Sequence, residues 1–202
     1  MRALLDNDFF AKTDAAGLLQ SVLVAFGLTL PDCACLASLA PKLRRGKWAR
    51  ELGAAAVALE ATAAGITHVP DAPAATLAKV QGVRDIDPGE AVLFALAAGS
   101  DSLLLFTGDK RALRAVAGIP EIRTELAGRI VTLEMAMLLV CRAVGVRKVK
   151  AALAASPVKD NALTCILGAG PDEEVFKAFK SYQESLAAEV GADLLWAPDD
   201  GE

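Results

Sequence analysis

The sequence contains a single histidine, one tyrosine and four cysteines, and aromatic residues make up only 5% of its 202 residues. Cys33 and Cys35 are the only cysteines close together, and one C-x-C pair with one histidine makes a poor zinc site. We therefore expect buried, reduced thiols that pack as small apolar side chains, which favours a cytoplasmic location. Because no cysteine or histidine stands out as a nucleophile, acidic side chains become the candidates for chemistry.

Long apolar runs are also missing, although the mean hydropathy is positive at +0.40. The longest candidate, IVTLEMAMLLVCRAVG, carries Glu134 and Arg142 and is shorter than the roughly 18 residues that a spanning helix needs. Near the N-terminus, Asp6 precedes any apolar segment of the kind that a secretory signal contains. We therefore expect no membrane partner.

Acidic residues outnumber basic ones, 25 to 21, so the net charge is −4. This charge argues against a general nucleic-acid coat protein. One basic segment stands out, PKLRRGKWAR, in which Arg44, Arg45 and Lys47 surround Trp48. It is either a solvated loop and helix start, or an RNA-binding surface that contacts phosphates and stacks a base on the tryptophan.

Apolar residues make up 54% of the chain. Short apolar segments at RALLD, ITHV, SLLLF and RIVTL predict strands, and helical patterns lie between them. The best-defined helix is DPGEAVLFALAAG, with Asp87 as its cap and Gly99 at its end. The segment CACLASLA is interpreted as helical. This order predicts an α/β fold with a parallel sheet wrapped by helices.

Carboxylates stand where two of the predicted strands end. Asp6 directly follows the first strand, Asp109 closely follows LLLFT, and Glu90 lies in the first turn of the helix before that strand. Ligands of parallel sheets bind beyond the carboxyl ends of the strands, so these acids would meet if the strands are neighbours. Such oxygen ligands suit Mg²⁺ or Mn²⁺, which could activate water against a phosphodiester. Alternatively, Asp6, Asp8 and Asp109 are ordinary helix caps.

Three segments in this order, LLDNDFFAKTDAAGLL, DPGEAVLFALAAGSDSLLLFTGDKRALRAVA and RIVTLEMAMLLVCRAVG, together resemble PIN-domain proteins. The resemblance is to the branch in which a D-P-G-E helix precedes a strand ending in T-x-D, and it covers about residues 1–150. It implies a three-layer α/β/α PIN-like fold with a central, mostly parallel sheet over residues 1–145, and leaves 146–202 as a helical C-terminal extension packed on it. PIN domains are metal-dependent nucleases, mostly ribonucleases, and many are toxins paired with an antitoxin protein.

The resemblance also implies roles for individual residues. Asp6, Glu90 and Asp109 match the acids that hold Mg²⁺ or Mn²⁺. Thr107 matches the threonine whose hydroxyl orients neighbouring carboxylates, and Asp8 matches a supporting position. RNA is the implied substrate, and the family often forms homodimers, for which CACLASLA would be a suitable low-charge surface.

One acid that the family usually carries, in the helix after the second strand, has no match here. Asp32 lies only near the start of that segment, and Glu51 or Glu60 would have to substitute from the next helix. Two other functions therefore stay open. One is a degenerate PIN domain acting as a non-catalytic RNA-binding or protein-interaction module. The other is a haloacid-dehalogenase-type phosphatase, because LLDND resembles the D-x-D motif of that family and LLLFTG its second motif. That resemblance implies Asp6 as nucleophile and Asp8 as acid/base.

Overall fold

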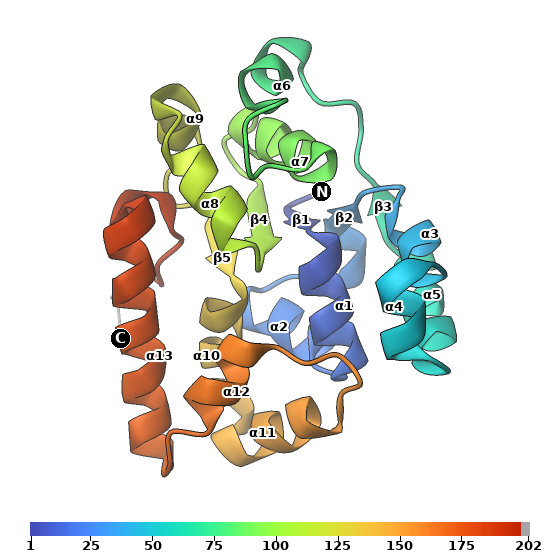
Figure 1. Cartoon of the computed structure of the whole chain (residues 1–202), viewed down its shortest axis with the longest axis vertical. Helices are drawn as coiled ribbons and strands as arrows, with labels where there is room; N and C mark the ends of the chain where they lie inside the picture. The colour runs from blue at the N-terminus through green and yellow to red at the C-terminus, as the bar shows by residue number, and fades with distance from the viewer. Residues whose placement is uncertain (199–202) are drawn as a thin grey trace.

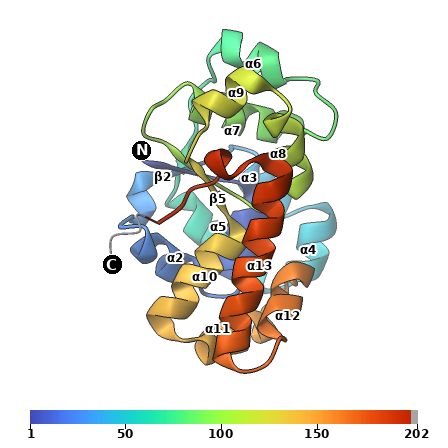
Figure 2. The same cartoon turned by 90° about the vertical axis from the view of Figure 1, so that its left-hand side faces the viewer.

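The computed structural model describes residues 1–198, except for the side chain of Lys47. The described residues form a parallel five-stranded sheet in the order β3–β2–β1–β4–β5. The strands are β1 (Ala3–Leu5), β2 (Cys33–Cys35), β3 (Thr67–His68), β4 (Leu104–Thr107) and β5 (Ile130–Thr132). Helices lie on both faces of this sheet, so the predicted α/β class and three-layer arrangement are confirmed (Figures 1 and 2).

The helices follow the strands along the chain in small groups. Before β4 they are α1 (Asn7–Ala15), α2 (Leu19–Ala25), the 3-10 turn η1 (Leu30–Asp32), α3 (Leu39–Leu43), α4 (Gly46–Leu52), α5 (Ala55–Ala64), α6 (Ala74–Val80) and α7 (Pro88–Ala98). After β4 they are α8 (Lys110–Ala117), α9 (Pro120–Glu125), α10 (Leu133–Val144), α11 (Val146–Ala155), α12 (Asn161–Leu167), α13 (Asp172–Val190) and the 3-10 turn η2 (Ala192–Leu194).

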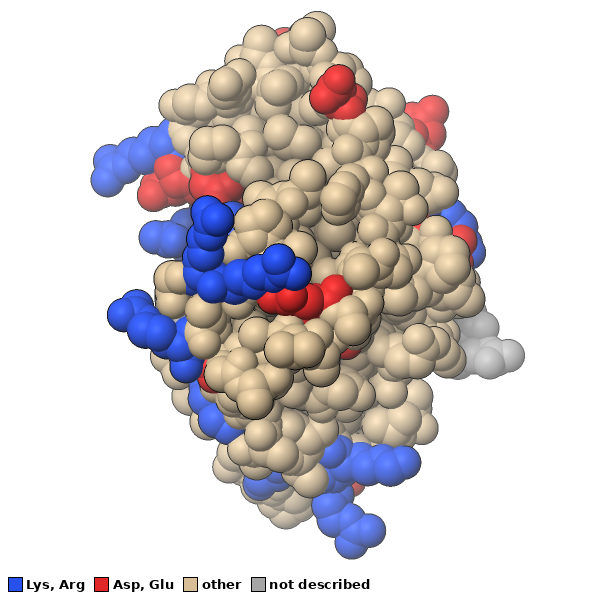
Figure 3. Space-filling model, turned by 90° about the vertical axis from the view of Figure 1, so that its right-hand side faces the viewer, with Lys and Arg blue, Asp and Glu red and all other residues tan. Residues whose placement is uncertain are grey.

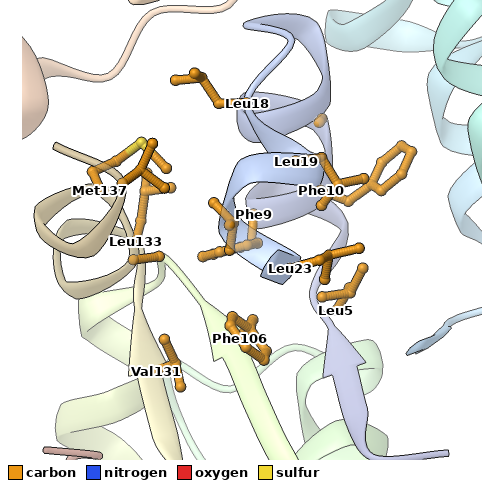
Figure 4. Packing of buried hydrophobic residues seen from close by; sticks show 14 of the residues in the cluster. Leu5, Phe9, Phe10, Leu18, Leu19, Leu23, Phe106, Val131, Leu133 and Met137 are labelled. Carbon is orange, nitrogen blue, oxygen red and sulfur yellow. The ribbon is translucent and has the colours of Figure 1, made fainter. Parts of the chain in front are cut away.

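Successive strand residues point into two different cores, as the period of a strand requires. Leu5 and Phe106 face a core built with α1, α2 and α10, whereas Leu4 and Leu105 face a core built with α7, α8 and α9. Figure 4 shows the first of these cores, where residues of α1 and α2 lie against β4, β5 and the start of α10. Because both faces are covered there, β1, β2, β4 and β5 consist largely of buried apolar residues, whereas the edge strand β3 is exposed.

The helical interpretation of CACLASLA was wrong. Its first three residues form β2, which is fully buried and pairs in parallel with β1. Pro31 and Asp32 do start a helical turn, but it is the short η1 and it ends where the strand begins. The residues Cys33–Cys35 are therefore part of an inner strand of the sheet and cannot belong to an exposed dimer surface, whereas Ala37 and Ser38 after them are exposed. Among the cysteines, three are buried as expected, whereas Cys165 is exposed.

The segment after residue 145 packs on the same cores as the rest of the chain. Val146, Val149 and Phe179 belong to the core that contains α1, and the Trp196 amide donates to the Ile130 carbonyl of β5 at 2.8 Å. Residues 199–202 of the predicted extension lie outside the described residues. Among residues 1–198, no helix combines the length and the apolar character needed to cross a bilayer.

Candidate functional site

The first and fourth strands bring the predicted site together. They lie side by side, with Leu5 opposite Phe106, and the strand order reverses between them. This reversal is the point of an open parallel sheet at which ligands bind, beyond the carboxyl ends of the strands. Asp6 follows β1 there, and the Thr107 hydroxyl at the end of β4 donates to Asp6 Oδ2 at 3.3 Å. The condition set by the sequence argument, that the two strands are neighbours, is met.

A polar cavity of about 430 Å³ opens at this edge of the sheet. All the acids assigned from the sequence line it, together with one that was not assigned: Asp6, Asp8, Asp87, Glu90 and Asp109. Basic side chains line it too, namely Lys12, Lys42, Lys110 and Arg111. The cavity therefore combines groups suited to a cation with groups suited to an anion.

Two of the predicted acids are held in place because they also cap helices. Asp109 Oδ1 accepts from the backbone amides of Arg111 and Ala112 at the start of α8. At the start of α7, Asp87 and Glu90 form a reciprocal capping box, in which Glu90 Oε2 accepts from the Asp87 amide at 2.7 Å. Capping thus explains one oxygen of each carboxylate. Of the other two oxygens, Asp109 Oδ2 lies 3.5 Å from the guanidinium of the exposed Arg111, and Glu90 Oε1 makes no capping bond.

Asp6 is different, because capping does not explain its place. It occupies the N-cap position of α1, yet its side chain makes no capping hydrogen bond within the described chain. The residue is only 8% exposed. Burial, and after it the negative charge of Asp8, raise the pKa of Asp6 to about 6. The fold thus keeps a carboxylate in a position where its charged form is costly.

The pKa of Glu90, which also lines the cavity, is raised as well. Burial raises its pKa to about 7, and the charges of Asp109, Asp87 and Asp6 add to that rise. Acids whose pKa is raised by burial and by neighbouring carboxylates are typical of functional sites. The threonine hydroxyl links two of them, because Thr107 Oγ1 also accepts from the Asp109 amide at 3.2 Å.

Two of the cavity lysines, Lys12 and Lys110, form ion pairs with carboxylates. Lys12 Nζ lies 2.6 Å from Asp8 Oδ2 and 2.8 Å from Asp160 Oδ2, which belongs to the residue before α12. Burial lowers the pKa of Lys12, but the two carboxylates outweigh it and raise the pKa above its usual value. Lys110 Nζ lies 2.6 Å from Glu134 Oε1 on the first turn of α10.

The predicted RNA-binding segment borders the cavity. Trp48 lines the cavity, and with Arg45 it also lines an adjoining hollow of about 450 Å³ between α3 and α4. Arg44 instead pairs with Glu60 of α5 at 2.8 Å, and the side chain of Lys47 lies outside the described part of the structure. Figure 3 views the side on which α3, α4 and α5 lie, where basic side chains gather beside acidic ones.

None of the proposed substitutes for the missing family acid lies among the described residues that line the cavity. Asp32 precedes β2, so it lies at the opposite end of the sheet from Asp6. Glu60 is engaged by Arg44, and Glu51 is an exposed residue of α4. The fifth acid of the cavity is Asp87, which the sequence argument assigned only as a helix cap.

From the sequence, no site role was assigned to Asp87, Lys12, Lys110 or Asp160, although the first three carry a local signal. Asp87 was visible within the D-P-G-E motif, and Lys12 stands four residues after Asp8, the spacing of a helical ion pair. Lys110 directly follows the T-x-D motif. Asp160 carried no local signal, because it reaches Lys12 across 148 residues of sequence.

The donor chemistry of the cavity fits a hard divalent cation. Within the described residues, no three His, Cys, Asp or Glu side chains are already grouped as a complete metal site. Mg²⁺ does not need such a group, because it usually keeps several waters and takes one or two carboxylates together with substrate phosphates. The carboxylate oxygens of Asp6, Glu90 and Asp109 are donors of that kind, although Asp109 Oδ2 would have to exchange its 3.5 Å contact with Arg111 for the ion. Comparison of the chain with protein-family models, curated proteins and solved structures finds no significant match.

Proposed function

We propose that this chain is a metal-dependent ribonuclease of the PIN type, which hydrolyses RNA phosphodiester bonds at the carboxylate cavity. The observation that carries the proposal is Asp6: a buried carboxylate with a raised pKa, beyond the end of β1 at the reversal of strand order. Ionising it there destabilises the fold, and a divalent cation would remove that cost. Helix capping, the simplest other use of an aspartate at this position, does not occupy its side chain.

Asp6, Glu90 and Asp109 would hold the Mg²⁺ or Mn²⁺ ion, with Asp8 in support. When bound, such an ion polarises a phosphodiester and lowers the pKa of a water molecule. The chain itself orients the ligands. Thr107 holds Asp6 Oδ2 through its hydroxyl, and the capping bonds at α7 and α8 fix Glu90 and Asp109.

The RNA strand would approach over α3 and α4. Lys42 and Trp48 line both the cavity and the adjoining hollow, and Arg45 lines the hollow. A basic groove with an aromatic side chain is how proteins bind single strands without reading sequence, because the cations contact phosphates and a base stacks on the ring. This placement supports the RNA-binding role proposed for Arg45 and Trp48, and puts Arg44 in an ion pair at the edge of that surface.

The experiment is cleavage of a labelled single-stranded RNA with Mn²⁺, with Mg²⁺ and with EDTA. Wild type is compared with Asp6→Asn, which removes the charge and nearly keeps the shape. Asp14→Asn is the matched control, because Asp14 is a partly buried aspartate of the same helix α1 and does not line the cavity. We expect metal-dependent cleavage by wild type and by the control, and a loss of cleavage of at least about a hundredfold for Asp6→Asn.

The other outcomes distinguish the remaining functions. RNA binding without metal-dependent cleavage on several RNAs would favour the non-catalytic module. Mg²⁺-dependent release of phosphate from p-nitrophenyl phosphate, lost in Asp6→Asn, would instead favour the phosphatase. Equal cleavage by Asp6→Asn and wild type would refute the assignment of the site.

A further inference from the structure

The cavity holds a lysine that is fixed far more firmly than a surface lysine. The side chain of Lys12 is only 17% exposed, and it lies between Asp8 and Asp160. Asp160 is itself fixed, because its Oδ1 accepts from the Leu163 amide as the cap of α12 while its Oδ2 accepts from Lys12. An ammonium held this way loses little conformational freedom when it binds a ligand.

The hydrogen-bonding capacity of this ammonium exceeds what the two carboxylates use. A lysine ammonium has three N–H donors. Asp8 and Asp160 each accept one, which leaves a third for a ligand in the cavity that Lys12 lines. An RNA phosphate that enters a cavity with five acidic residues needs such a donor, because the carboxylates repel it.

The other lysine of this part of the cavity, Lys110, is better explained as structural. It pairs with Glu134, whose side chain is fully buried, and its ammonium lies 5.8 Å from the ring centre of Tyr182. Both contacts tie α8 to α10 and α13. Lys12 instead contacts Asp8, a residue of the cavity, on one side.

We propose that Lys12 binds a phosphate oxygen of the RNA substrate, and that the C-terminal segment completes the site through Asp160, a positioning residue that holds this lysine. The proposal rests on the ribonuclease function proposed above. It gives residues beyond the PIN resemblance a role in the site, because without Asp160 the ammonium would be held by Asp8 alone.

The test is fluorescence anisotropy of a labelled single-stranded RNA, with Ca²⁺ in place of Mg²⁺ and over a series of salt concentrations. Lys12→Met should weaken binding about tenfold, the usual effect of losing one charged hydrogen bond. It should also lower the slope of log K against log salt by about 0.7, the value for one phosphate contact on a single strand. A lysine with a purely structural role would leave that slope unchanged.

Two further variants sharpen the test. Asp160→Asn keeps a capping oxygen for α12 but removes the charge that holds Lys12, so we expect a several-fold loss of binding. This variant also carries the test if Lys12→Met fails to fold. Lys177→Met is the matched control, since Lys177 is an exposed lysine of α13 that pairs with Glu173 and Glu174 of the same helix and does not line the cavity. It should bind as wild type does.

The outcomes separate this inference from the proposed function. Unchanged affinity and salt slope in both Lys12→Met and Asp160→Asn would overturn the role of Lys12, even if wild type cleaves RNA with Mn²⁺. The expected losses of binding without any metal-dependent cleavage would support the phosphate contact and overturn the ribonuclease. A wild type that does not bind the RNA would overturn both.

Discussion

Replacing Asp6 by asparagine should make the metal-free protein more stable at neutral pH. The raised pKa means that the folded state resists ionisation of this carboxyl, so stability is fully present below about pH 4 and falls as the pH rises through 6. The rise from 3.8 to about 6 corresponds to about 3 kcal/mol at pH 7.5. Burying the new amide costs part of this free energy, so we expect Asp6→Asn to be about 1–3 kcal/mol more stable than wild type.

Urea unfolding followed by circular dichroism measures this difference, in EDTA, at pH 4.5 and at pH 7.5. The advantage of Asp6→Asn should be largest at pH 7.5 and should shrink at pH 4.5, where wild-type Asp6 is protonated. Asp71→Asn, at an exposed loop position, should show no such pH-dependent gain. A variant that is less stable than wild type at pH 7.5, or an advantage that does not depend on pH, would refute the reasoning from burial.

Added metal should reverse the comparison. An ion that binds only the folded protein stabilises it by about 2.7 kcal/mol at a hundred times its dissociation constant. Wild type should gain this stability with Mn²⁺, and Asp6→Asn should gain clearly less. Equal gains by the two proteins would show that the ion binds somewhere other than at Asp6.

Other perturbations test the site and the core that supports it. Mn²⁺ affinity, measured by electron paramagnetic resonance, should fall about tenfold for each pH unit below 7. The reason is that Glu90, whose pKa is about 7, must lose its proton to bind the ion. An affinity that is flat from pH 6 to 8 would argue against Glu90 as a ligand. Glu134→Ala should cost about 3–5 kcal/mol in urea unfolding, because it leaves the largely buried Lys110 without its counter-charge, and a cost below about 1 kcal/mol would mean that water reaches this lysine. Phe106→Ala should cost a similar 3–5 kcal/mol, because this ring meets two other phenylalanine rings edge-on in the core; a small loss would show that the core collapses into the space.

Local sequence signals predicted the helices whose capping residues can be recognised in the sequence. The helix at Asp87–Gly99 has its cap, its first-turn proline and its terminal glycine where the sequence places them. The cap at Asp109 was equally clear, because a strand ends there and a helix begins. Glycines set further helix boundaries. Gly17 and Gly53, with φ of +67° and +52°, separate α1 from α2 and α4 from α5.

The second strand escaped prediction because nothing in its three residues distinguishes it from a helix. A buried strand has no polar alternation, and Cys33–Cys35 is too short to show a period. Its place is decided by the hydrogen bonds it makes with β1, which lies about thirty residues earlier in the chain. The same pairing removes Cys33–Cys35 from the dimer surface proposed for CACLASLA, since only the sheet shows that these residues are buried.

For the site, the sequence alone identified acids at the ends of strands, because apolar runs that stop at a carboxylate are visible residue by residue. The tertiary structure decided the rest. It placed β1 beside β4, which brings Asp6 to Thr107, and it showed that Asp6 is buried without capping a helix. It also brought Asp160 to Lys12. These are contacts between residues about 100 or more positions apart, and they depend on how the helices pack on the sheet, which no local pattern encodes.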